Sequence, residues 1–66
     1  MTNLNEMSRL SNRITKLTGC EFDTAWDAVM KASPAQGKWL WALVYKKDTV
    51  SLEEAIKTIN QKEDVA

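Results

Sequence analysis

Histidine is absent from this sequence, and cysteine occurs once, as Cys20. Histidine is the commonest general base at neutral pH and the commonest metal ligand, so its absence removes most catalytic and metal-binding arrangements. Nothing is available to activate Cys20 as a nucleophile, and a single cysteine forms no intramolecular disulfide. We therefore expect a protein that is not an enzyme and needs no metal or other cofactor, with Cys20 as a structural thiol.

Glycine is also scarce. Gly19 and Gly37 are the only glycines, so the chain has no glycine-rich phosphate loop. Asp23 and Asp27 lie one helical turn apart, but acidic residues in the early turns of a helix are common partners of the helix dipole. We interpret this pair as structural rather than as a site of two catalytic carboxylates.

Long apolar runs and excess charge are missing too. The longest apolar segment, residues 39–45, is far shorter than the roughly 18 residues of a membrane helix, and the polar N-terminus lacks the features of a signal peptide. These absences and the single cysteine predict a soluble cytoplasmic protein with no membrane partner. Nine basic and nine acidic side chains cancel, which argues against binding driven by nucleic-acid phosphates.

What the chain does contain is the composition of a small globular protein. Hydrophobic residues make up 44% and charged residues 27% of its 66 residues. A chain of this size supports one hydrophobic core, so residues 1–66 are predicted to form a single domain. Residues 62–66 follow the last apolar helix and are predicted to be a frayed tail.

A first helix is predicted over residues 4–18. Apolar residues recur there at spacings of three or four, which places them on one side of a helix. Asn3 is a suitable N-cap with Glu6 three residues later, and Gly19 can take the left-handed conformation that ends a helix. The predicted core positions are Leu4, Met7, Leu10, Ile14 and Leu17.

A second helix is predicted over residues 21–32. It again has apolar residues at helical spacing, and residues 18–21 have the form of a capping box. The short connection at Gly19 requires the first two helices to pack as neighbours. The predicted core positions are Phe22, Ala25, Trp26, Val29 and Met30.

A third helix is predicted over residues 34–46. Ser33 is its expected N-cap, Pro34 occupies the first helical position, and Gln36 can bond back to the cap. Residues 39–45 are short and aromatic enough to form a buried strand instead. We favour the helix because the capping signals are specific and no second strand is available for pairing.

A fourth helix is predicted over residues 52–61. Ser51 and Glu54 form a capping box, with Val50 as a hydrophobic staple before it. The predicted core face is Leu52, Ala55, Ile56 and Ile59. Together the four segments predict an all-α fold, a compact single-domain bundle of four short helices.

The predicted helix over residues 34–46 is apolar on two sides. At 100° per residue, Trp41 and Tyr45 project beside Lys38, nearly opposite the side that carries Leu40. Either this helix is central and covered on both sides, or Trp41 and Tyr45 form an exposed aromatic patch. On the second interpretation Trp41, Tyr45 and Lys38 are candidate partner-binding residues. The side of Leu40 also carries Trp39, Leu43 and Val44.

Residues 17–29, LTGCEFDTAWDAV, resemble the first half of ubiquitin-associated (UBA) and elongation-factor-Ts N-terminal domains, and residues 52–59, LEEAIKTI, are similar to their last helix. The likeness covers about half of the chain, and residues 33–50 depart from the usual three-helix pattern by adding an apolar segment. The resemblance implies a helical binding module with a partner surface on the loop after the first helix and on the last helix. Its residues here are Gly19, Phe22, Ile56 and Ile59.

The leading functional hypothesis is a small protein-protein interaction module or regulatory protein. It would bind either another protein or a second copy of itself, as a homodimer. A nucleic-acid-binding regulator is the alternative, because Arg9, Arg13 and Lys16 form a basic stripe suited to phosphate contacts. We favour the other explanation of this stripe, a solvated face that pairs with the nearby Glu21, Asp23 and Asp27. A third possibility is a structural subunit of a larger assembly. No small-molecule substrate is inferred.

Overall fold

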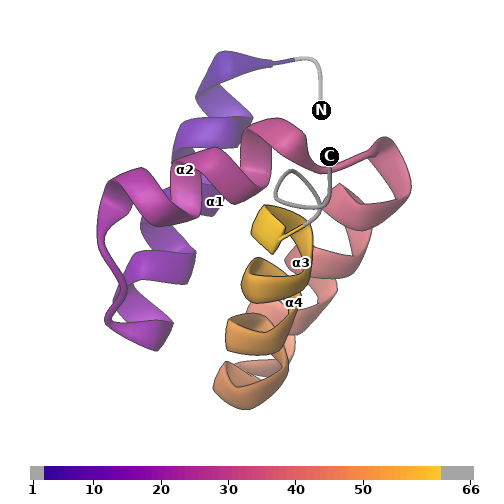
Figure 1. The fold of residues 1–66 in the computed structure, drawn as a ribbon. Coiled ribbons are helices and arrows are strands. Elements are labelled where there is room, and N and C mark those ends of the chain that lie inside the picture. The colour runs from indigo at the N-terminus through magenta and orange to yellow at the C-terminus, as the bar shows by residue number, and fades with distance from the viewer. Residues whose placement is uncertain (1–2, 62–66) are drawn as a thin grey trace.

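The computed structural model describes residues 3–61, and in this range the chain folds into four α-helices with no strand (Figure 1). The all-α prediction is therefore confirmed, and residues 39–45 are helical. The first and third helices have the predicted bounds, whereas the fourth begins three residues before the predicted start. The predicted frayed tail lies outside the described residues. The helices are α1 Leu4–Thr18, α2 Phe22–Lys31, α3 Pro34–Lys46 and α4 Thr49–Gln61.

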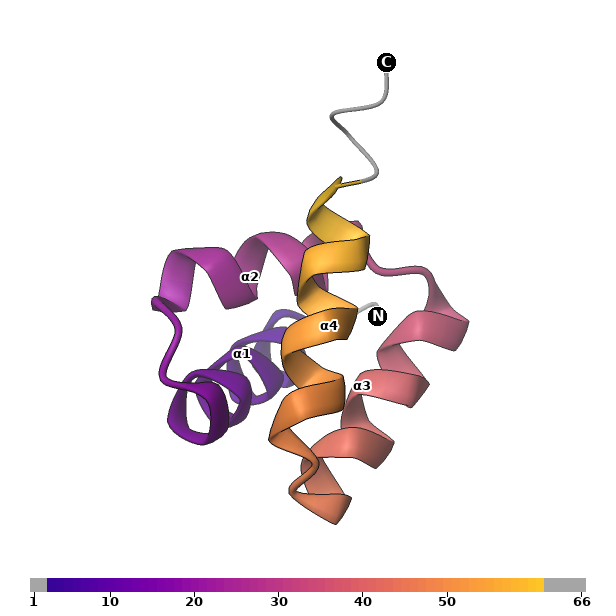
Figure 2. The same cartoon turned by 60° about the horizontal axis from the view of Figure 1, so that its bottom comes forward.

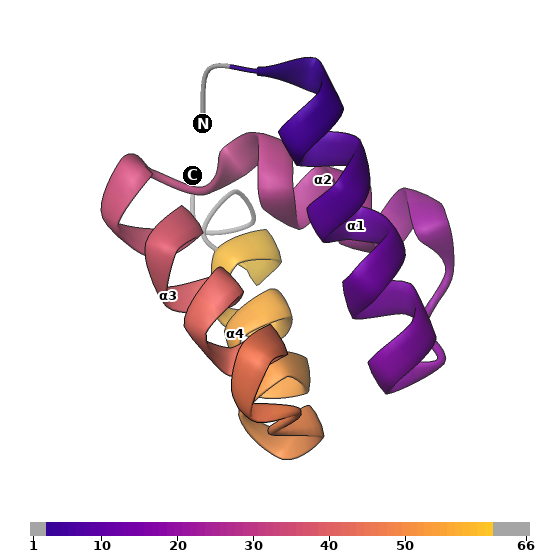
Figure 3. The same cartoon turned by 180° about the vertical axis from the view of Figure 1, so that it is seen from behind.

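The four helices form two layers. α2 and α4 lie in front of α1 and α3 in Figure 1, and the view from behind in Figure 3 reverses this order. α1 and α4 each contact all three other helices, whereas α2 and α3 touch each other only slightly. Figure 2 shows α4 in front, with α2 and α3 on either side of it. α2 and α3 are therefore the two outer helices of the bundle.

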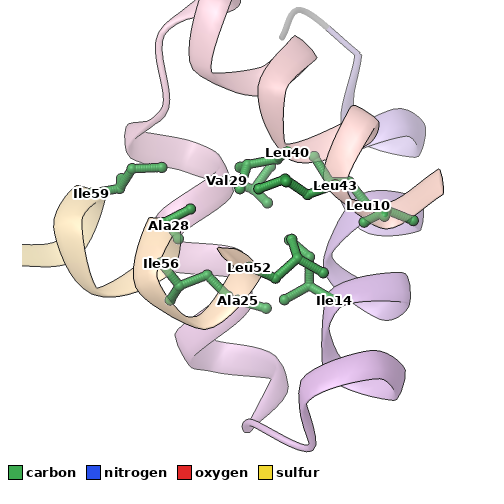
Figure 4. Close-up of a cluster of buried hydrophobic side chains, with 12 residues drawn as sticks. Leu10, Ile14, Ala25, Ala28, Val29, Leu40, Leu43, Leu52, Ile56 and Ile59 are labelled. Atoms are coloured by element: carbon green, nitrogen blue, oxygen red, sulfur yellow. The ribbon is translucent and has the colours of Figure 1, made fainter. Parts of the chain in front are cut away.

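One core is shared by all four helices, and its side chains converge between the layers (Figure 4). The predicted face of α4 is buried completely, as are Leu10 and Ile14 on α1. Burying aliphatic surface of this kind supplies most of the stabilisation of a small domain. The buried hydrophobic residues are Leu10, Ile14, Ala25, Ala28, Val29, Leu40, Leu43, Val44, Leu52, Ala55, Ile56 and Ile59.

Three predicted core residues are exposed instead. Leu4 is 70% exposed and Phe22 39% exposed, and Met30 is also open to solvent. On α2 the buried positions are Ala25, Ala28 and Val29, and Phe22 and Met30 project to one flank of that narrow face. Leu4 occupies the first turn of α1. The helical spacing identified amphipathic helices correctly but overestimated the width of their buried sides.

Local capping explains where α1 and α3 begin. Asn3 Oδ1 accepts a hydrogen bond from the Asn5 N–H at 2.8 Å, which confirms the predicted cap. At α3 the capping box is complete: Gln36 N–H donates to Ser33 Oγ, and Ser33 N–H donates to Gln36 Oε1. These bonds satisfy backbone amides that have no partner inside the helix.

The α1–α2 connection also follows local rules, but the predicted capping box there is wrong. Gly19 ends α1 in the left-handed conformation with φ 78°, as predicted. Thr18 Oγ1 accepts from the Cys20 N–H at 3.3 Å and donates to the Ile14 carbonyl at 2.8 Å. Glu21 precedes α2 without a side-chain cap. Thr18 therefore closes α1 rather than opening α2.

The start of α4 corrects a second capping prediction. Asp48, and not Ser51, is the capping residue: Ser51 N–H donates to Asp48 Oδ1 at 3.2 Å, and Ser51 Oγ–H donates to Oδ2 at 2.8 Å. These bonds from Ser51 hold the pKa of the Asp48 carboxyl below its ordinary value. Val50 is exposed and is not a staple. The helix begins earlier than predicted because a stronger acceptor lies three residues upstream.

Candidate binding surfaces

The first candidate surface lies on the outer side of α3. Leu40, Leu43 and Val44 hold this helix against the core, while Tyr45 is 79% exposed and Trp41 is half-buried at the edge of the core. The Trp41 and Tyr45 rings stack with centroids 5.8 Å apart and planes inclined by 28°. This side of the helix is therefore aromatic and largely open.

Lysine accompanies this aromatic pair. Lys38 is exposed and projects within about 60° of Trp41 and Tyr45 around the helix axis. We call Lys38, Trp41 and Tyr45 the α3 patch. Residues 34–47 contain three lysines and no carboxylate. Besides Lys38, these are Lys46, the last residue of α3, and Lys47, its C-cap. The surroundings of the α3 patch are consequently basic, although the whole chain has no net charge.

The position of α3 in the bundle explains why the patch is open. α3 packs on α1 and α4 only along the side of Leu40, and it is an outer helix. The interpretation of α3 as a central, fully covered helix is therefore wrong. Trp39, predicted to lie with the buried side, is 44% exposed. It projects about 100° from Leu40 and so lies at the opposite flank from Trp41.

The second candidate surface is a groove between α1 and α2, with a volume of about 540 Å³. Phe22 and Trp26 stack along its α2 side, with centroids 5.9 Å apart and planes inclined by 20°. Asp23 contributes a carboxylate, and the exposed Asp27 follows one turn later on α2. We call this surface the α1–α2 groove. Its lining residues are Leu4, Asn5, Ser8, Phe22, Asp23 and Trp26.

Sequence reasoning did not identify the α1–α2 groove. It assigned Leu4, Phe22 and Trp26 to the core because they follow the helical spacing. A signal was nevertheless present: Asp23 projects about 60° from Trp26, on the side of α2 that lies away from Ala25. Carboxylates are almost never buried without a partner, so their flank of a helix is normally exposed.

The third candidate surface is a smaller pocket of about 290 Å³ between the end of α1 and α4. Gly19 and Ile56, two of the four residues indicated by the UBA resemblance, both line it, beside the half-buried Cys20. Phe22 lies in the α1–α2 groove instead, and Ile59 is buried in the core. The structure thus brings two of these four candidates together.

The basic stripe of α1 is exposed along its whole length. Arg9, Arg13 and Lys16 all face solvent. In the part of the chain that the structure describes, none of them forms an ion pair with an acidic residue. The pairing with nearby carboxylates that the sequence suggested is not present. A row of cations without an acidic partner among residues 3–61 therefore remains on α1.

Two further properties concern metal binding and membrane crossing. Within residues 3–61, no three His, Cys, Asp or Glu side chains lie together as they would to hold a metal ion. None of the helices between these residues combines the length and apolarity needed to cross a membrane.

Comparisons with protein-family models, with curated proteins and with solved structures find no match for this chain. The UBA resemblance is neither supported nor contradicted by them and stays a prediction.

Proposed function

We propose that this chain is a protein-interaction module that binds a protein partner through the α3 patch. The observation that carries the proposal is the stacked pair of Trp41 and Tyr45 on an outer helix, with Tyr45 79% exposed. Tryptophan and tyrosine are the residue types most enriched where binding energy concentrates in protein interfaces. Contiguous apolar surface that is rimmed by polar residues is typical of interaction sites.

Stacking also prepares the pair for binding. Two aromatic rings one helical turn apart restrict each other's rotamers, so less side-chain entropy is lost when a partner covers them. Trp41 packs partly against the core, which fixes its position relative to the backbone. Tyr45 presents a ring and a hydroxyl, and Lys38 adds a long cation at the edge. The patch thus combines an apolar centre with polar groups at its rim.

Binding and folding use different residues of α3. Leu40, Leu43 and Val44 supply the core contacts, while Tyr45 lies outside the buried cluster. Replacement of Tyr45 should therefore affect a partner more than the fold. This separation makes the proposal open to a direct test.

The test places a photo-crosslinking residue, p-benzoylphenylalanine, at position 45 and, as a matched control, at the exposed position Glu54 on α4. After irradiation in the native host, we expect adducts of defined mass at position 45 that are absent from the control. Mass spectrometry identifies them. The double substitution Trp41→Ser and Tyr45→Ser should abolish the association while circular dichroism shows intact helix. Equal labelling from both positions, or a loss of helix in the double variant, would contradict the proposal.

The basic stripe of α1, which has no acidic partner within the described residues, supports a second candidate function, binding to nucleic acid through Arg9, Arg13 and Lys16. Three phosphate contacts would give an affinity that falls steeply with salt. The measurement is duplex-DNA binding by fluorescence anisotropy over a series of salt concentrations, with the triple Arg9→Gln, Arg13→Gln, Lys16→Gln variant as control. Absence of binding at low salt excludes this candidate.

A further inference from the structure

The molecule carries two aromatic surfaces of opposite charge. On α3 the stacked pair Trp41–Tyr45 lies beside Lys38, in a segment with three lysines and no carboxylate. On α2 the stacked pair Phe22–Trp26 lies beside Asp23, which lines the same groove, and Glu21 and Asp27 are close to it in the sequence. Both pairs have the same spacing of four residues.

The two surfaces also differ in shape. The α3 patch projects from an outer helix, and its Tyr45 side chain is 79% exposed. The α1–α2 groove is concave, with about 540 Å³ between Leu4 on one wall and Phe22 and Trp26 on the other. A volume in this range accepts large apolar groups, and an aromatic lining favours aromatic ones.

We propose that the α3 patch of one copy of this chain binds the α1–α2 groove of a second copy. Tyr45 enters the groove against Phe22 and Trp26, and Lys38 faces the carboxylates of Asp23 and Asp27. This proposal rests on the proposed function, because it takes the α3 patch as the binding surface and names the partner as the chain itself.

Charge selects this contact over the two symmetric alternatives. Patch against patch brings two copies of Lys38 together, and groove against groove brings two copies of Asp23 and Asp27 together. Like charges placed face to face oppose association, whereas patch against groove joins opposite charges. The unlike surfaces are therefore the favoured pair.

Contacts between unlike surfaces have a further consequence. α2 and α3 are the outer helices, in different layers of the bundle and hardly in contact with each other. A copy that uses its α3 patch still has an unoccupied α1–α2 groove. Heterologous contacts of this kind produce rings or open chains. Association therefore continues beyond the dimer unless two copies close a ring by exchanging both contacts.

The test is sedimentation equilibrium of the purified chain and of two charge reversals, Lys38→Glu and Asp23→Lys. We expect concentration-dependent association of the natural chain that weakens between about 0.05 M and about 0.5 M salt. Each reversal alone should weaken association by about tenfold at low salt. An equal mixture of the two variants should restore it, because the new glutamate then meets the new lysine.

Matched controls change the charge elsewhere. Lys57→Glu and Glu54→Lys on α4 alter the net charge equally but lie outside both surfaces, so they should leave association unchanged. Because Asp23 lies in the first turn of α2, where an acidic side chain suits the helix dipole, Asp27→Lys, one turn later on α2 and outside the groove lining, serves as a second charge variant. Circular dichroism checks that every variant keeps its helices.

Two results overturn the inference. A monomer at every concentration in low salt does so directly. Loss of association in Tyr45→Ser, with no effect of Asp23→Lys or Asp27→Lys, shows a symmetric contact between α3 patches. In either case crosslinks from position 45 to a different protein, or patch-to-patch adducts, would leave the proposed function standing. If position 45 gave no specific crosslink at all, both the proposed function and the self-association inferred here would be wrong.

Discussion

α3 and α4 are both thirteen residues long, but they differ in how they use their apolar side chains. α4 buries Leu52 and Ile59 on one face and contacts all three other helices. α3 is the more apolar in sequence but lies at the outside of the bundle, so Trp41 and Tyr45 are left on its open side. An apolar helix is therefore central only if enough neighbours surround it. In a domain this small, excess apolar surface is available for binding.

The largest effect should come from the centre of α4. Leu52 is completely buried among core residues of the other helices, so Leu52→Ala removes apolar contacts and leaves a cavity. We expect a loss of about 2–5 kcal/mol in the free energy of unfolding, measured by urea denaturation. Ile59→Val should cost about 0.5–1.5 kcal/mol and remain folded. If Leu52→Ala lowered the free energy of unfolding by less than an exposed substitution does, the contrast between the buried face of α4 and the open side of α3 would be wrong.

An intermediate effect is expected at the start of α3. Ser33→Ala removes the side-chain oxygen that accepts from the Gln36 N–H and should lower stability by about 0.5–2 kcal/mol in thermal or urea unfolding. Ser51→Ala is the matched comparison on α4. Ser51 lies inside α4 and only donates to Asp48, so its loss should be smaller. The reverse order would mean that Ser51 is the effective cap of α4.

The cap of α4 should also depend on pH. Hydrogen bonds from Ser51 lower the pKa of Asp48 in the folded state below its ordinary value of 3.8. The ionised carboxylate therefore stabilises the folded state fully above the ordinary pKa, and this contribution is lost as pH falls through the lowered one. Asp48→Asn keeps an acceptor but removes the charge. The gap in melting temperature between the natural chain and Asp48→Asn should be constant near about pH 6 and close toward about pH 2. A gap that stays open at acidic pH would contradict this assignment.

The smallest effect on stability is expected on the open side of α3. Tyr45→Ser removes a largely exposed side chain and should change the free energy of unfolding by no more than about 0.5 kcal/mol. The same substitution should weaken self-association at least about tenfold in sedimentation equilibrium. Stability and binding would then be carried by opposite sides of one helix. A large stability loss would show that the Tyr45 ring supports the fold through its stack on Trp41.

The sequence by itself determined the four helices and most of their ends. Apolar spacing located α1 and α2 to within one residue at each end, and Ser33 with Gln36 located the start of α3, because capping and helical periodicity depend on residues only a few positions apart. The start of α4 was missed although its signal is also local. Asp48 and Ser51 are both suitable caps, and the path of the chain out of α3 decides between them. That path turns at Lys47, which takes the left-handed conformation with φ 56°.

Only the tertiary structure decided which apolar side chains are covered. Leu4, Phe22 and Met30 follow the same spacing as Leu10 and Val29, so the spacing of apolar residues does not separate the exposed group from the buried one. The hydrophobic effect has no direction, so a side chain is buried only where another element lies over it. α1 and α4 each contact all three other helices, whereas α2 and α3 hardly touch each other, so α2 and α3 lie at the outside. This arrangement, and not the helices taken singly, leaves the Phe22–Trp26 and Trp41–Tyr45 pairs accessible to a partner.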